Sequence, residues 1–264
     1  MGSPNKERRP TVLCLSGHDP GGGAGIQADI ETVAALGGHA LSLISAHTVQ
    51  DTTDVTRVQA VDLALLREQA AVLLADVAPR AIKVGLLGSA AQAGFVSELA
   101  RQTGAPVVLD PVLRAGGGAE LAPAGLLDAL AALLPQVEVL TPNAAEARRL
   151  APGAGDLDAC GRELLRRGAR NVLITGGDES EAGAGESVVN RWFRGDGSPR
   201  AFAWPRLAGP FHGAGCTLAS AIATLLARGE SVGAALADAQ AWVHQALQRG
   251  FRPGRGRPIP GRAP

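Results

Sequence analysis

The stretch that decides the fold is TVLCLSGHDPGGGAGIQAD, residues 11–29. A short apolar run leads into a glycine-rich loop, and a helical pattern begins near Gly25. An apolar run that hardly alternates is typical of a strand buried on both faces of a parallel sheet. Glycines let backbone amides approach a ligand closely, and the start of a helix favours anions. The loop matches neither a Walker A loop nor the dinucleotide fingerprint, so a tight strand-to-helix turn stays open as the alternative.

The same alternation of apolar run and helical pattern continues along the chain. Each run is short and is closed by Gly, Pro or Asp, as expected for parallel strands that alternate with helices. The sequence therefore predicts an α/β fold, a doubly wound, mostly parallel sheet with helices on both faces. The further strand candidates are residues 40–48, 81–87, 106–110, 137–142 and 171–177, and the helical patterns are residues 62–75, 91–102, 124–134, 157–167 and 216–228.

Composition limits the classes of protein to which the chain can belong. It has 264 residues, with 25 basic and 25 acidic side chains, 3% aromatics and no Tyr. A balanced charge and few aromatics argue against a nucleic-acid partner. No apolar stretch is long enough for a membrane helix or a signal peptide, so we expect no membrane association. Three distant cysteines suggest neither a zinc site nor a disulfide framework, which favours a cytoplasmic location.

The two ends of the chain differ in composition from the region between them. Residues 1–10 are predicted to be a disordered N-terminal tail, and residues 252–264, rich in Pro, Gly and Arg, a disordered C-terminal tail. No linker interrupts the strand–helix series between them. We therefore expect one domain over residues 11–251.

A second glycine-rich turn, PFHGAGC at residues 210–216, opens a long apolar helix. The amides of Ala214, Gly215 and Cys216 would point outward at the start of this helix and could stabilise charge on a transferring phosphoryl group. The same helix terminus should lower the pKa of Cys216, whose thiolate could then accept a proton from a substrate hydroxyl. The alternative is a small buried cysteine that only packs.

A third motif, LTPNAAEARRL at residues 140–150, places Asn143 and Glu146 three residues apart at the start of a helix. This pair could hold a hydrated magnesium ion or form a capping box.

Lys83, the only lysine besides Lys6, lies inside an apolar run. Buried there it needs a partner, either Asp110 on a nearby strand or a phosphate.

Together these motifs resemble the hydroxymethylpyrimidine/phosphomethylpyrimidine kinases of thiamine biosynthesis, a branch of the ribokinase-like superfamily. The resemblance covers roughly residues 11–250 and implies a ribokinase-like three-layer α/β/α sandwich. Cys216 stands at the position where the superfamily commonly carries Asp. The pyrimidine kinases are similar to this chain in carrying Cys there. The segments that carry the resemblance are SGHDPGGGAGIQADIETVAALGGHA, HTVQDT, AIKVGLLGS, VVLDPVLRAGGGAEL, LTPNAAEA, NVLITGG and HGAGCTLASAIA.

The resemblance implies phosphorylation of 4-amino-5-hydroxymethyl-2-methylpyrimidine and then of its monophosphate. It implies ATP as donor, Mg²⁺ as cofactor with K⁺ as a candidate second cation, and a homodimer. The catalytic positions would be Cys216 with Gly213, Ala214 and Gly215; the substrate-binding positions Gly17, Asp29, Gln50 and Leu86; the ATP- and phosphate-binding positions Asp110, Asn143, Thr175, Gly177 and His212; and the metal-binding position Glu146.

The sequence also departs from the family pattern. Thr175 stands where some relatives carry Lys, and residues 114–120 replace a loop that usually contains Lys. Two alternative functions therefore stay open, namely a pyridoxine or pyridoxal kinase of the same fold and a non-catalytic pyrimidine-binding protein.

Overall fold

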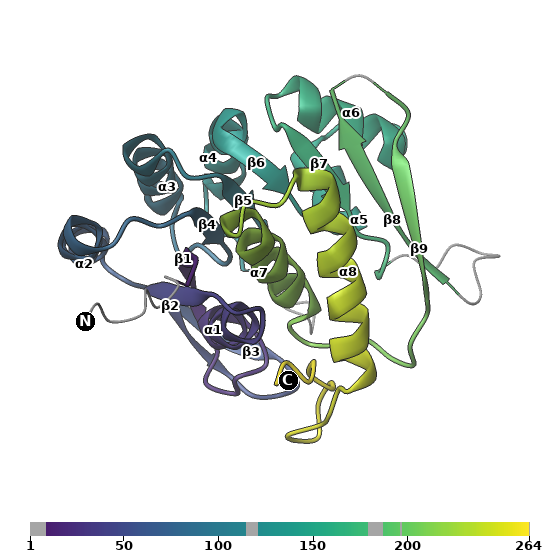
Figure 1. The fold of residues 1–264 in the computed structure, drawn as a ribbon, viewed down its shortest axis with the longest axis horizontal. Helices are drawn as coiled ribbons and strands as arrows, with labels where there is room; N and C mark the ends of the chain where they lie inside the picture. Colours follow the sequence, from purple (N-terminus) through teal and green to yellow (C-terminus); the bar gives the residue numbers. More distant parts are fainter. Residues whose placement is uncertain (1–8, 115–120, 179–186, 196, 264) are drawn as a thin grey trace, which may run out of the picture.

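A nine-stranded sheet forms the centre of the protein in the computed structural model, which describes residues 9–114, 121–178, 187–195 and 197–263 (Figure 1). Six neighbouring strands pair in parallel, and three antiparallel strands extend the two edges. The predicted α/β class and mostly parallel sheet are thus confirmed. In spatial order the strands are β3 (Val55–Ala60), β2 (His39–Gln50), β1 (Thr11–His18), β4 (Ala81–Val84), β5 (Val107–Leu109), β6 (Val137–Leu140), β7 (Asn171–Ile174), β8 (Ser187–Arg194) and β9 (Arg200–Pro205).

Helices cover both faces of the sheet and complete a three-layer sandwich. In Figure 1 the long helices of one face lie in front of the sheet. None of the helices within the described residues is long and apolar enough to cross a membrane. One face carries α1 (Gly25–Ala35), α7 (Ala214–Ala227) and α8 (Val232–Gln248), and the other carries α2 (Leu63–Asp76), α3 (Ala90–Thr103), α4 (Leu126–Leu133), the 3₁₀ turn Leu134–Gln136, α5 (Ala144–Leu150) and α6 (Leu157–Arg166).

The apolar runs do not alternate because each strand contributes to two cores. Along β1, Leu13 and Leu15 pack under α2 and α3, whereas Val12 and Cys14 pack under α1 and α7, and all four are fully buried. Both faces of a parallel strand are covered by crossover helices, so both sets of side chains must be apolar.

The structure adds three antiparallel strands that the apolar runs do not indicate. β3 and β9 form the two edges of the sheet, and many of their side chains remain exposed to solvent. β8 lies one strand inside the edge and carries polar residues among its apolar ones. Partly exposed strands of this kind lack the continuous apolar run that marks a buried parallel strand.

The expected disordered C-terminal tail is wrong for residues 252–263, which fold back against the body of the protein. Phe251 and Ile259 pair in an antiparallel bridge, and Ile259 is buried. The guanidinium of Arg262 is buried as well and hydrogen-bonded. The amides of Gly256 and Arg257 bond to Thr52 in the β2–β3 turn. Specific polar contacts, which composition does not reveal, therefore hold this segment.

At the other end of the chain, residues 1–8 of the expected N-terminal tail lie outside the described residues.

Candidate active site

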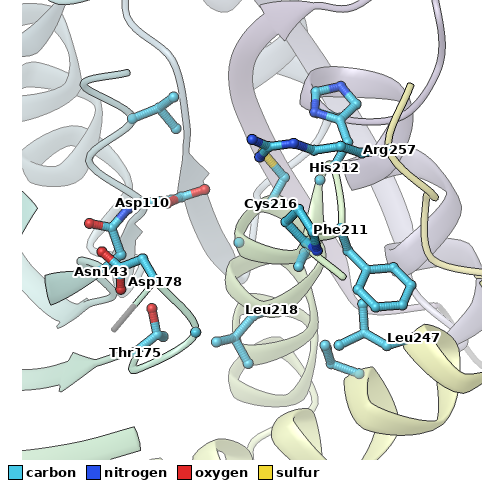
Figure 2. Close-up of a pocket in the computed structure, with 18 of the residues that line it drawn as sticks. Asp110, Asn143, Thr175, Asp178, Phe211, His212, Cys216, Leu218, Leu247 and Arg257 are labelled. Atoms are coloured by element: carbon cyan, nitrogen blue, oxygen red, sulfur yellow. The ribbon is translucent and has the colours of Figure 1, made fainter. Parts of the chain in front are cut away.

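A cavity of about 470 Å³ opens where the parallel strands end, beside the start of α7 (Figure 2). Parallel strands bring their carboxyl ends to one edge of the sheet, where ligands bind in such folds. All the predicted site residues except Asp29 line this cavity. They are Gly17, Gln50, Leu86, Asp110, Asn143, Thr175, Gly177, Glu146, His212, Gly213, Ala214, Gly215 and Cys216.

The loop between β1 and α1 is organised by the carboxylate of Asp19. Asp19 accepts hydrogen bonds from the amides of Gly21 at 2.7 Å, Gly23 at 3.0 Å and Ala24 at 2.9 Å. His212 Nε2 lies 2.8 Å from Asp19 Oδ2. Burial works against the charged carboxylate, but the bonds from His212 and Gly21 prevail and lower the pKa of Asp19. Three loop amides are thus committed to Asp19, so this loop is the tight turn that the sequence left as the alternative.

A set of amides that an anion could reach belongs to the second glycine-rich turn. α7 begins at Ala214, two residues earlier than the sequence pattern suggests, and Gly213 precedes it with φ at +81°. A Cβ on Gly213 would collide with the carbonyl oxygen of Gly23. The first amides of a helix have no partner within the helix, and here these residues line the cavity.

Cys216 lies in the first turn of α7 and faces the cavity, but the expected lowered pKa is wrong. Burial raises the pKa of this thiol to about 12, and the nearby carboxylates of Asp110 and Asp29 raise it further, while Lys83 opposes them. The desolvation of a buried thiolate outweighs the favourable end of the helix. Cys216 is therefore a neutral thiol at physiological pH.

The expected partner of Lys83 is wrong as well. Lys83 Nζ lies 2.8 Å from Asp29 Oδ1 and 2.9 Å from Ser16 Oγ, and the Lys83 and Asp29 side chains are fully buried. Ser220 Oγ also donates to Asp29 Oδ1 at 2.7 Å. Burial lowers the pKa of Lys83, but the Asp29 carboxylate more than compensates and raises it. Asp29 is thus an internal counter-ion beneath the cavity and does not line it.

The acidic end of the cavity is built around the start of α5. Asn143 Oδ1 accepts from the Glu146 amide at 2.9 Å, and Glu146 Oε2 accepts from the Asn143 amide at 3.0 Å, which is a capping box. Asp178 receives the next two amides, those of Ala144 and Ala145. Burial, with help from the charge of Asp110, raises the pKa of Glu146 to about 8.

Asp110 follows β5 and lies between the acidic end and α7. Burial raises its pKa to about 6, while Lys83 acts in the opposite direction. Its Oδ2 atom is buried and has no hydrogen-bond partner. A solvent-excluded carboxylate oxygen without a donor is costly, so this atom is available to a cation or to a donor on a ligand.

The other three substrate positions suggested by the resemblance, Gly17, Gln50 and Leu86, line the cavity where β1, β2 and β4 end. Gly17 lies against Leu86, since a Cβ on Gly17 would be 2.8 Å from Leu86 Cδ2. Gln50 closes β2 beside them with its side chain half-buried. A flat ring would find an apolar wall and one amide able both to donate and to accept a hydrogen bond.

Several cavity residues escaped the sequence analysis. Asp178 lies just beyond a strand end and follows Gly177, so the rule that ligands gather at strand ends could have found it. Trp204 and Leu247 come from β9 and α8, elements that no sequence pattern singled out. Arg257 belongs to the segment that was expected to be disordered, and it lies near His212 in Figure 2.

Comparison with known proteins finds sequence relatives over most of the chain. The sequence model of a family described as phosphomethylpyrimidine kinase matches residues 19–260. A hydroxymethylpyrimidine/phosphomethylpyrimidine kinase of Streptomyces coelicolor is 39% identical, covering 94% of this chain and 92% of its own length. A bifunctional thiamine biosynthesis protein of Geobacter sulfurreducens is 40% identical over 94% of this chain, which spans 51% of that protein.

Solved structures of two kinase types share the fold. Pyridoxal kinase from Staphylococcus aureus in complex with AMP-PCP, an ATP analogue, has a TM-score of 0.86 at 27% identity, covering 96% of this chain and 94% of its own. Phosphomethylpyrimidine kinase from Clostridium difficile has a TM-score of 0.76 at 28% identity, covering 91% of this chain and 100% of its own. The fold alone does not separate the two kinase types, whereas the matching family model and the Streptomyces coelicolor relative are both named as pyrimidine kinases.

Proposed function

The chain belongs to the phosphomethylpyrimidine kinase family, and we propose that it phosphorylates 4-amino-5-hydroxymethyl-2-methylpyrimidine and then its monophosphate in thiamine biosynthesis. ATP is the phosphoryl donor. The observation that carries the proposal is that one cavity has three regions, one each for the acceptor ring, the phosphoryl group and the metal ion. These are an apolar wall at Gly17 and Leu86, the first amides of α7, and an acidic end at Asp110 and Glu146.

The chemistry we propose is in-line transfer of the γ-phosphoryl group. The bond from the γ-phosphorus to the bridging oxygen breaks as a bond to the hydroxymethyl oxygen forms, ADP leaves, and the hydroxyl proton passes to water. Charge spreads over the equatorial phosphoryl oxygens in a loose transition state, so positioning and electrostatics dominate catalysis. The amides of residues 213–216 donate to these oxygens.

In this mechanism Cys216 guides the acceptor and does not remove its proton. A thiol whose pKa is raised to about 12 is not a base at neutral pH. In a loose transition state the bond to the incoming oxygen forms late, so the proton leaves late and no strong base is needed. The thiol then orients the hydroxymethyl oxygen toward the phosphorus.

Magnesium fits the acidic end of the cavity. Within the described residues no cluster of three or more His, Cys, Asp or Glu side chains could hold a metal. Mg²⁺, however, is commonly bound by one or two carboxylates together with waters and substrate phosphates. Asp110, through its unpartnered Oδ2, and Glu146 would hold it. When bound, the ion neutralises charge on the nucleotide phosphates.

The second candidate is a pyridoxal kinase, favoured by the high structural similarity to that enzyme. A comparison of acceptor substrates separates the two functions. ADP release is measured with the hydroxymethylpyrimidine, with its monophosphate and with pyridoxine. A higher kcat/KM for both pyrimidines supports the proposal. A higher value for pyridoxine would assign the chain to the other reaction, and binding without ADP release would indicate a non-catalytic pyrimidine-binding protein.

Replacing Cys216 with alanine tests its guiding role. We expect kcat to fall by about 10- to 100-fold, the cost of a misplaced reactant, with an unchanged pH profile. Cys160→Ala, which removes a buried thiol in α6, is the matched control and should leave kcat intact. Wild-type turnover in Cys216→Ala would remove the residue from the mechanism, and loss of an ionisation from the pH profile would instead make it a base.

The raised pKa of Glu146 predicts a pH-dependent stability without Mg²⁺. Its pKa is about 8 in the folded protein and 4.5 ordinarily. Between these values the folded state holds a proton that the unfolded chain has lost, so stability falls as the pH rises. Asp110 contributes in the same way only up to about pH 6. The Glu146 contribution to the slope approaches about 1.4 kcal/mol per pH unit between about pH 6 and 7 and falls to about half of that at pH 8.

Urea unfolding across that pH range measures this slope. In Glu146→Gln the decline should flatten. It should persist in the control Glu68→Gln, which replaces an exposed glutamate of α2. A decline of equal steepness in both variants would contradict the assignment to Glu146.

We further propose a homodimer and K⁺ as second cation, both on the basis of the family resemblance. Light scattering of the purified protein gives its mass in solution. Turnover in potassium and in sodium buffers of equal ionic strength tests the cation. A monomer, or equal rates in the two buffers, would overturn the respective proposal.

A further inference from the structure

The guanidinium of Arg262 is fully buried between the two glycine-rich turns. Its Nε donates to Thr217 Oγ1 at 2.9 Å. Nη1 donates to the Gly22 carbonyl at 3.4 Å, and Nη2 donates to the Gly23 carbonyl. A single side chain from the C-terminal segment thus bonds both to the loop after β1 and to the first turns of α7.

These contacts reach the start of α7 directly. Thr217 Oγ1, which accepts from Arg262, donates to the Gly213 carbonyl at 2.7 Å. A Cβ on Gly213 would lie 2.8 Å from Arg262 Nη2 and would collide with the Gly23 carbonyl. The guanidinium therefore contacts the junction of the two turns. Asp19 links the same turns through the Gly23 amide and His212.

The segment that carries Arg262 is itself held at several points. The carbonyl of Pro258 accepts from the His212 amide at 2.9 Å, and the Gly261 amide donates to Ala246 at 2.9 Å. Residues 258–260 are buried. The hydrogen bonds and burial of this stretch therefore hold Arg262 in place against the two turns.

Burying a guanidinium between two loops carries a large desolvation cost. Among the described residues its carboxylate partner is Glu31, at 3.0 Å from Nη1, whose side chain is 42% exposed. Removing a cation from water is costly unless its donors are satisfied and its charge is balanced, and packing alone would not require a charge. The positive charge lies beneath the α7 amides, where it adds to the favourable end of the helix for an anion.

We propose that Arg262 is a positioning residue for phosphoryl transfer. It holds the two glycine-rich turns in register and places positive charge under the amides of residues 214–216. The inference rests on the phosphoryl transfer of the proposed function, but it does not depend on which acceptor is used.

The test compares Arg262→Ala, Arg262→Lys and the wild-type protein in steady-state kinetics with Mg-ATP. We expect kcat of Arg262→Ala to fall by about 10²-fold, since misplacing catalytic groups by about 1 Å costs that much. KM for the acceptor should change little. Arg262→Lys keeps the charge but not the planar fork, and should lose about 10-fold in kcat with a near-normal melting temperature. Guanidinium ion, well below denaturing concentration, should restore part of the activity of Arg262→Ala.

The matched control is Arg249→Gln, because Arg249 bonds from the surface to the carbonyl of Gly261 in the same segment. It should keep wild-type kcat and gain nothing from guanidinium. A folded Arg262→Lys or Arg262→Ala with wild-type kcat would overturn the proposal. So would losses that merely follow the unfolded fraction and do not respond to guanidinium. Each variant is assayed with whichever acceptor the wild-type protein uses, so a wrong acceptor assignment is detected separately in the wild type.

Discussion

Replacing Lys83 with methionine is expected to lower the free energy of unfolding by about 3–5 kcal/mol, the usual cost of removing one partner of a buried ion pair. The change leaves the Asp29 carboxylate in the core without its cation, with Ser220 Oγ as its remaining side-chain donor. Ser16 Oγ also loses a donor. The penalty is mainly that of the uncompensated charge, since methionine fills much of the same volume.

Urea unfolding measures this loss, and Arg170→Met is the matched control. Arg170 lies 2.8 Å from Glu138, the same distance as in the buried pair, but its side chain is 65% exposed. The control should lose no more than about 1 kcal/mol. The double variant Lys83→Met/Asp29→Leu should recover much of the lost stability, because it removes the stranded charge as well. Equal losses in Lys83→Met and Arg170→Met would contradict the role of burial.

The second large effect is expected in Gly213→Ala. We expect kcat to fall by about 10²- to 10³-fold, the range seen when a donor to a developing oxyanion is lost. Gly213 has φ at +81°, and its Cβ would collide with the Gly23 carbonyl. Relief of the collision must move the turn, and with it the amides of Ala214 and Gly215. Steady-state kinetics with saturating Mg-ATP measures the loss.

Gly229→Ala separates catalysis from backbone strain. Gly229 lies just beyond the other end of α7 with φ at +91°, and a Cβ there would meet nothing within 4 Å. The two variants share the cost of a positive φ, about 1 kcal/mol. Only Gly213→Ala disturbs the cavity, so Gly229→Ala should keep wild-type kcat. Similar kcat values for the two variants would contradict the assigned role of the α7 amides.

The central sheet and the position of the cavity could be predicted because both follow from local pattern. Apolar runs between helical patterns imply parallel strands, and residues just beyond such runs meet at one edge of the sheet. This rule picks out Gln50, Asp110 and Asn143, which follow such runs and line one cavity. Edge strands such as β3 and β9 escaped it, because a strand that is partly exposed has no continuous apolar run.

Long-range electrostatics could not be predicted in the same way. The partner of Lys83 depends on how α1 packs on β4, and sequence spacing offered Asp110 where the fold supplies Asp29. The pKa of Cys216 depends on its burial, which a motif at a helix start does not reveal. Arg262 was missed because the composition of its segment resembles that of a solvated tail, while its contacts join residues 240 positions apart.

The measurement that tests the account most directly is the mass of the product formed from the hydroxymethylpyrimidine with excess Mg-ATP. The account predicts a monophosphate that is then converted to the diphosphate, with one ADP released at each step. A reaction mixture in which the pyrimidine stays unphosphorylated, while pyridoxal in a parallel reaction gains a phosphate, would contradict it.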